Sequence, residues 1–158
     1  MRVFITGASS GIGAALSRAF AARGDTLGLV ARNPDKLASF VKTLPFAEKH
    51  VPYAVDVTDR TGLLAAARDF EAKGETDIVI ACAGISIGVK TEYFEDLDVL
   101  ERIYKTNVFA MASTFHGFIA PMKSRGRGQF VGIGSVAGIR GLPGSEAYCS
   151  SKAAVISY

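Results

Sequence analysis

The sequence has few of the side chains that build metal centres or disulfide frameworks. It contains two cysteines, Cys82 and Cys149, and two histidines, His50 and His116. These four residues lie in unrelated segments and show no metal-ligand spacing. We therefore expect no metal site, and the two thiols fit a reduced, cytoplasmic protein best.

Long apolar runs and strong charge are also missing. No run approaches the roughly 18 apolar residues that a membrane span needs, and the first residues break at a glycine before any signal-like apolar core forms. The formal net charge is only +3, and the basic residues are scattered, so we expect neither a membrane nor a nucleic-acid partner. The short basic run at 123–127 is expected to be a solvated helix end.

The chain itself alternates short apolar runs with segments of helical periodicity. Its 158 residues, 49% hydrophobic and 21% charged, suffice for one domain with a real core. Strands are expected at 2–6, 26–31, 50–57, 77–83 and 128–135. Helices are expected at 11–24, from Asn33 to about 44, at 60–73, at about 98–123 and from about 145 to the end. Alternation of this kind predicts an α/β fold, a Rossmann-like doubly wound parallel sheet of about five strands with helices on both faces.

The last residues continue an apolar helical pattern without a stop signal, and Tyr158 lies inside it. A sheet that ended at the fifth strand would leave a long apolar edge, which proteins normally cover or pair. We therefore expect residues 1–158 to form a single nucleotide-binding domain that is incomplete at its C-terminus.

A glycine-rich turn, "TGASSGIG", joins the first strand to the first helix. Gly7 permits a sharp turn, Gly11 lets the backbone approach a pyrophosphate, and Gly13 allows close packing of helix on strand. The helix N-terminus offers free N–H groups to the anion. Ser9 and Ser10 add hydroxyl donors. The context of strand, turn and helix is the one that dinucleotide binding requires.

The end of the second strand bears on cofactor choice. Folds that prefer NAD place an acidic side chain there to hold the ribose 2′-hydroxyl. This chain has Ala31 at that position and Arg32 next to it. Without a repelling carboxylate, the Arg32 guanidinium can bind a 2′-phosphate, so we predict NADP(H) over NAD(H). The alternative is that Arg32 is only a solvated loop residue.

Near the C-terminus, "EAYCSSK" puts Tyr148 and Lys152 one helical turn apart. A free phenol titrates near pH 10, too high for efficient acid–base work at neutral pH. A nearby ammonium in a poorly solvated cleft favours the phenolate, which makes the phenol a usable proton donor and acceptor. Ser135, thirteen residues before Tyr148 at the end of the fifth strand, can donate a hydrogen bond to a substrate carbonyl.

The G-x-x-x-G-x-G spacing, together with Ser135, Tyr148 and Lys152, resembles the short-chain dehydrogenase/reductase family, and the resemblance covers essentially the whole chain. It implies a fourth catalytic residue, Asn107, which holds a water that relays protons to Lys152; a mid-helix asparagine also indicates a local kink. It implies the following cofactor contacts: Gly7, Ser9, Ser10, Gly11, Ile12, Gly13, Arg32, Asp56, Val57, Ala83, Gly84, Tyr148 and Lys152.

Three positions leave room for other interpretations. Asp56 matches an adenine-contacting aspartate of the family, but it can equally cap a turn or helix. Cys82 stands where the family usually has asparagine, so we expect a structural cost there more than lost chemistry. Cys149 lies beside Tyr148 without an acidic or histidine partner in sequence, which favours inert packing.

The resemblance implies an NADP(H)-dependent oxidoreductase that interconverts a carbonyl and an alcohol by hydride transfer, and a homodimer or homotetramer. Two alternatives stay open: a nucleotide-binding module or sensor without turnover, and an epimerase or dehydratase of the same fold. Few polar side chains occur in the loop after the fourth strand and at 139–144, which indicates a fairly apolar small-molecule substrate.

Overall fold

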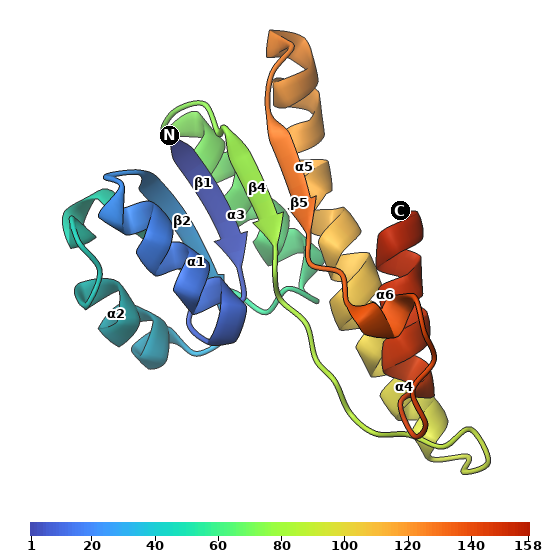
Figure 1. Ribbon diagram of the computed structural model, residues 1–158. Helices are drawn as coiled ribbons and strands as arrows, with labels where there is room; N and C mark the ends of the chain where they lie inside the picture. The colour runs from blue at the N-terminus through green and yellow to red at the C-terminus, as the bar shows by residue number, and fades with distance from the viewer.

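One parallel sheet organises the chain. The computed structural model describes residues 1–158, with five strands in the order β3-β2-β1-β4-β5. The strands are β1 (Arg2–Thr6), β2 (Thr26–Ala31), β3 (Val51–Ala54), β4 (Ile78–Ala81) and β5 (Gln129–Gly132). All four pairings are parallel, and the arrows of β1, β4 and β5 point the same way in Figure 1. The predicted doubly wound sheet is confirmed.

Helices cover both faces of this sheet. They are α1 (Gly11–Ala22), α2 (Pro34–Lys42), α3 (Arg60–Ala72), α4 (Asp96–Tyr104), α5 (Ala110–Arg125) and α6 (Glu146–Ser157). One buried apolar cluster joins the sheet to α1 and α2, and a second joins it to α3 and α5. In the second, the Phe4 ring lies 5.7 Å from the Phe70 ring and 4.9 Å from the Phe118 ring, between centroids. Burial of these rings supplies much of the driving force for folding.

Local sequence signals explain several helix ends. The Asn33 side chain accepts a hydrogen bond from the Lys36 N–H at 2.8 Å, and Pro34 occupies the first turn of α2. Gly126, in the left-handed conformation, ends α5. None of the helices combines the length and apolar character needed to cross a bilayer.

Some expected boundaries were wrong. The strands expected at 50–57, 77–83 and 128–135 are each only four residues long, because the remaining residues form the loops that carry the site. The long helix expected at about 98–123 is interrupted by a π-helical segment, Lys105–Phe109, which separates α4 from α5. A π-helical turn places an extra residue in the helix, and such turns often occur at functional sites.

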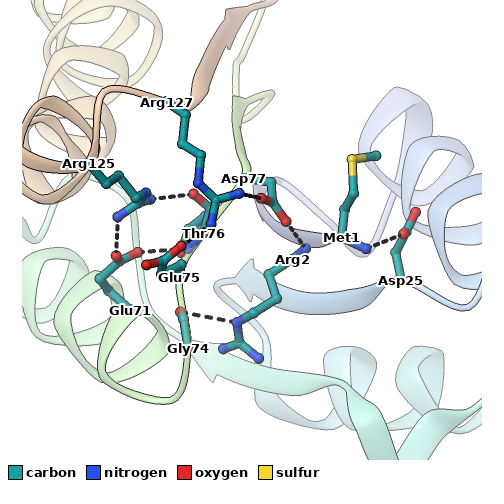
Figure 2. A network of polar contacts seen from close by, with 10 residues as sticks. All are labelled: Met1, Arg2, Asp25, Glu71, Gly74, Glu75, Thr76, Asp77, Arg125 and Arg127. Atoms are coloured by element: carbon teal, nitrogen blue, oxygen red, sulfur yellow. Dashed lines mark hydrogen bonds and ion pairs between the residues drawn. The ribbon is translucent and has the colours of Figure 1, made fainter.

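The basic run at 123–127 ends a helix as expected, but its description as solvated was wrong for Arg125. Arg125 is only 13% exposed, and its guanidinium pairs with Glu71 at 2.6 Å and donates to the Thr76 carbonyl. Arg127 contacts Glu75 and Asp77. Figure 2 shows these contacts in one network, with Arg2 donating its backbone N–H to Asp77. The network ties the C-terminal ends of α3 and α5 to the sheet, at the end away from the loops after β1 and β4.

We predict that Arg125→Ala lowers the free energy of unfolding by about 2 kcal/mol, because it leaves the partly buried Glu71 carboxylate with the Thr76 N–H but without its charged partner. The matched control is Arg127→Ala, whose ion pairs are exposed and should contribute about 0.5 kcal/mol. Urea unfolding followed by circular dichroism measures both. Equal effects of the two substitutions would contradict the role given to burial.

Candidate functional site

The turn after β1 brings three backbone segments into contact. A Cβ atom on Gly13 would lie 2.2 Å from the Gly7 carbonyl oxygen, and one on Gly7 would lie 2.9 Å from the Ala83 Cα atom. Gly7 also has a φ of +68°, which side chains disfavour. The start of α1 therefore packs directly on the end of β1, and the end of β1 packs directly on the segment after β4.

The N-terminus of α1 suits an anionic ligand. Ser10 caps this helix, but its hydroxyl makes no capping hydrogen bond. The first N–H groups of any helix lack partners within the helix and carry its positive dipole end. Open space surrounds the Cα atom of Gly11, since nothing lies within 4 Å of the position of a Cβ atom there. These features fit a dinucleotide pyrophosphate.

A cavity of 540 Å³ lies beside this turn, at the carboxyl ends of the strands. Because the order of strands reverses between β1 and β4, this is the position where doubly wound folds bind ligands. The residues that line it and were expected to contact a cofactor are Gly7, Ser9, Ser10, Arg32, Asp56, Val57, Ala83 and Gly84. Five expected residues lie outside the lining: Gly11 and Ile12 are exposed, Gly13 is buried, and Tyr148 and Lys152 lie on α6.

Arg32 and Asp56 face each other in this cavity. Nη1 of Arg32 lies 4.0 Å from Oδ2 of Asp56, and both side chains are largely exposed. Asp56 also accepts hydrogen bonds from the backbone and hydroxyl of Thr58, so it does form a turn. Burial raises the pKa of the Asp56 carboxyl, but the Thr58 hydrogen bonds and the Arg32 charge outweigh it and hold this pKa below its ordinary value. A charged Asp56 can therefore accept from an amino group while Arg32 stays free to bind another anion.

Several lining residues were missed from the sequence. Asn33 and Lys36 line the cavity beside Arg32, and the spacing of four residues from Arg32 to Lys36 was a usable signal. From the other side, the lining includes Asp98, Glu101, Arg102, Lys105 and Thr106. No local pattern indicated these, since only the tertiary packing of α4 and the π-helical segment brings them to the cavity.

The expected catalytic residues lie around the start of α6. Lys152 is 7% exposed, and its Nζ donates to the Ile133 carbonyl oxygen at 2.6 Å. The same Nζ lies 5.8 Å from the centre of the Tyr148 ring. Ser135 follows Ile133 by two residues and caps the 3₁₀ turn η3 (Val136–Gly138), its Oγ accepting from the Ala137 N–H. This turn packs on α6, because a Cβ atom on Gly138 would lie 2.6 Å from the Lys152 backbone.

Burial governs the charges of two neighbouring groups. It lowers the pKa of the Lys152 ammonium from its ordinary value of 10.5, with Cys82 acting weakly in the other direction. It raises the pKa of the Cys82 thiol, which the Lys152 charge opposes. A neutral thiol and a partly desolvated ammonium therefore lie near each other.

Asn107 lies inside the π-helical segment and is 3% exposed. Its Oδ1 accepts from the Ile85 N–H at 2.8 Å, and its Nδ2 donates to the Ile85 carbonyl at 2.9 Å and to the Ser151 hydroxyl at 3.0 Å. Gly84 separates this amide from Lys152: a Cβ atom there would lie 3.3 Å from Oδ1 and 3.8 Å from Lys152 Nζ. The asparagine, the lysine and the cavity wall thus meet at one glycine.

The two cysteines occupy different surroundings. Cys149 is buried and its sulfur accepts from the Leu142 N–H at 3.3 Å. At the end of β4, the hydroxyl of Thr6 accepts from the N–H groups of Cys82 and Ala83 at 3.1 and 3.2 Å. This threonine therefore ties β1 to the segment after β4 without help from the Cys82 side chain.

The fold is a Rossmann-like doubly wound sheet, and the cavity beside the N-terminus of α1 lies where such folds bind nucleotides. The sequence model of the family described as short chain dehydrogenase matches residues 1–158. The chain belongs to this family, whose members bind NAD(P)(H).

Known proteins agree with this assignment. A short chain dehydrogenase of Pseudocercospora fijiensis is 34% identical over 98% of this chain and 51% of its own length. A 3-ketodihydrosphingosine reductase of Bos taurus is 35% identical over 97% of this chain and 48% of its own. The crystal structure of a short-chain dehydrogenase from Streptomyces avermitilis superposes with a TM-score of 0.90 at 30% identity, over 99% of this chain and 57% of that one. The chain thus spans about half the length of these relatives.

The buried ammonium should make stability depend on pH. A lysine whose folded-state pKa is lowered costs stability while it is protonated, and this cost disappears as pH rises from the lowered value to 10.5. We predict that Lys152→Met is at least as stable as the wild type at pH 7 and loses its relative advantage as pH approaches 10.5. Urea unfolding of both proteins across this range measures the difference, and an advantage that grows with pH would contradict the prediction.

Proposed function

We propose that this chain carries the cofactor site and the catalytic residues of an NADP(H)-dependent oxidoreductase that interconverts a carbonyl and an alcohol. The observation that carries the proposal is the meeting of Lys152, Asn107 and the cavity wall at Gly84. An ammonium and a relay amide at the edge of this cavity have a clear use in proton transfer.

The residues of this chain would hold the cofactor along the cavity. The N-terminus of α1 and the Ser9 and Ser10 hydroxyls bind the pyrophosphate. Asp56 and Val57 receive the adenine, and Ala83 and Gly84 let the dinucleotide pass close to the backbone. The Lys152 ammonium, 3.8 Å from the position of a Cβ atom on Gly84, can hydrogen-bond the nicotinamide ribose.

Positive charge at the end of β2 favours NADP(H), which carries a 2′-phosphate, over NAD(H). Ala31 leaves no carboxylate for a ribose 2′-hydroxyl, and Arg32 and Lys36 bring two cations to the same part of the cavity. Asp56 holds Arg32 only loosely, at 4.0 Å, so a 2′-phosphate can replace it at little cost. Such a phosphate would accept charge-assisted hydrogen bonds from the guanidinium.

The bound nicotinamide supplies or accepts the hydride. In carbonyl reduction, Ser135 and Tyr148 donate hydrogen bonds to the substrate oxygen, and Tyr148 then gives its proton to that oxygen. Lys152 keeps a positive charge beside the phenol, which stabilises the phenolate left behind. Asn107 retains one lone pair on Oδ1, beside Gly84, that can hold a water on the path from Lys152 to solvent.

The surroundings of Ser135 favour an apolar substrate. Val136, the residue after Ser135, is 71% exposed, and Ile139 and Leu142 on the following loop are 82% and 42% exposed. Among the relatives, the bovine protein is named as the reductase of a keto compound. We propose an apolar ketone or aldehyde as substrate, to be tested as a series of alkyl carbonyls of increasing chain length.

Cofactor preference is tested by fluorescence titration of the chain with NADPH and NADH. We predict that NADPH binds at least about tenfold more tightly, and that Arg32→Ser weakens NADPH binding by about tenfold or more, the loss of one charge-assisted contact. NADH binding should change by less than about twofold. Equal weakening for both cofactors would show that Arg32 does not contact a 2′-phosphate.

Catalysis is tested by Tyr148→Phe, which removes only the hydroxyl. We predict a fall in kcat for carbonyl reduction of about 100-fold to 10,000-fold, the usual contribution of general acid catalysis. The matched control, Tyr104→Phe on α4, should keep wild-type activity. NADPH binding by the wild type without any carbonyl reduction would instead identify a binding module that does not turn over.

A further inference from the structure

Ser151 is a buried polar residue that the mechanism above leaves without a role. It lies on α6 between Tyr148 and Lys152, and it is completely inaccessible to solvent. A buried hydroxyl needs hydrogen-bond partners, and the partners that it has reach beyond its own helix.

The hydrogen bonds of Ser151 have a defined direction. Its single hydroxyl hydrogen donates to the Tyr148 carbonyl at 2.8 Å, so its oxygen is left to accept, and it accepts from Asn107 Nδ2 at 3.0 Å. The other Nδ2 hydrogen goes to the Ile85 carbonyl at 2.9 Å, and Oδ1 accepts from the Ile85 N–H. Both amide hydrogens of Asn107 are therefore used, and only one Oδ1 lone pair remains.

This arrangement joins three segments that are distant in sequence. Ile85 follows β4, Asn107 lies in the π-helical segment, and Ser151 belongs to α6. A reversed amide would set Oδ1 against the Ile85 carbonyl and Nδ2 against the Ile85 N–H, two repulsive contacts. Ile85 therefore fixes the orientation of the amide, and Ser151 fixes its distance from the helix that carries Tyr148 and Lys152.

We propose that Ser151 is a positioning residue that holds the Asn107 amide in register with the Lys152 ammonium, so that the proton path through Asn107 is aligned with the Tyr148–Lys152 pair. This inference rests on the proposed function of Asn107 and Lys152. It assigns to Ser151 an effect on turnover with little effect on cofactor binding, because the serine does not line the cavity.

The neighbouring serine offers a matched control. Ser150 lies on the same turn of α6, but it is exposed and its hydroxyl donates only to the Glu146 and Ala147 carbonyls of its own helix. Ser150→Ala removes the same atoms as Ser151→Ala without touching Asn107.

The first experiment compares Ser151→Ala, Ser151→Cys and Ser150→Ala by steady-state kinetics with NADPH and a small activated carbonyl. We expect Ser151→Ala to lower kcat by at least about tenfold with the KM for NADPH within about twofold. Ser151→Cys keeps a γ atom in the site, slightly larger than oxygen, but it hydrogen-bonds weakly, so its kcat should lie between those of the wild type and Ser151→Ala. Ser150→Ala should match the wild type. In an Asn107→Ala background, Ser151→Ala should cause no further loss of kcat.

Three results would overturn the inference: equal behaviour of Ser151→Ala and Ser150→Ala, full activity of Ser151→Cys beside an impaired Ser151→Ala, or additive losses with Asn107→Ala. The second result would mean that the side chain only fills space. Circular dichroism checks that each variant is folded, and Ser151→Cys is the variant to use if the alanine substitution unfolds the chain.

A second readout does not need turnover. Nuclear magnetic resonance of the Asn107 side-chain amide should show slow hydrogen exchange in the wild type and in Ser150→Ala, and faster exchange in Ser151→Ala and Ser151→Cys. If the wild type reduces no carbonyl but this pattern holds, the proposed function fails and the positioning contact stands. If exchange is the same in all four proteins, the positioning inference is overturned whether or not the chain is active.

Discussion

The close approach of backbone at the end of β1 is the constraint on which the site depends. Gly13 packs on the Gly7 carbonyl, and Gly7 packs on Ala83, with no room for a side chain at either position. Thr6 adds two hydrogen bonds from its hydroxyl to the backbone after β4. Together these contacts place the N-terminus of α1 and the loop after β4 at the same end of the sheet, which opens the cavity between them.

The second half of the site is connected to the first by a buried charge. The Lys152 ammonium is buried and donates to the Ile133 carbonyl just after β5, so α6 is held to the sheet through this group. Burial of an ammonium is energetically unfavourable. One hydrogen bond and the nearby Tyr148 ring partly replace the hydration that Lys152 loses. The positions of Tyr148 and Lys152 relative to the cavity thus follow from where β5 ends.

Periodicity and turn chemistry predicted most of the fold from sequence. The bounds of β1 and β2 matched those expected, since each is a short apolar run that ends at a glycine or at a polar loop. The Asn33–Pro34 start of α2 followed from capping chemistry that acts over only three residues. The shortened β3, β4 and β5 were not predictable in this way, because hydrophobic runs there continue into loops that are half-buried by tertiary contacts.

The same division applies to the site. The glycine-rich turn after β1 and the spacing of four residues between Tyr148 and Lys152 could be recognised in the sequence, because the residues involved lie close together along the chain. The contacts of Ile85 with Asn107 and of Asn107 with Ser151 span 22 and 44 residues, and no local rule connects them. The π-helical segment was visible only as an asparagine in an unfavourable helical position, which indicated a kink but not its form.

Cys82 shows how a departure from a family pattern can be absorbed. An asparagine at this position would offer an amide to neighbouring strands, whereas the backbone here is already tied by the Thr6 hydroxyl. Burial keeps the thiol neutral by raising its pKa, so the side chain adds no anion beside Lys152. A thiolate there would instead attract the Lys152 ammonium. Burial at the end of β4 thus leaves the Lys152 ammonium without an anionic neighbour at Cys82.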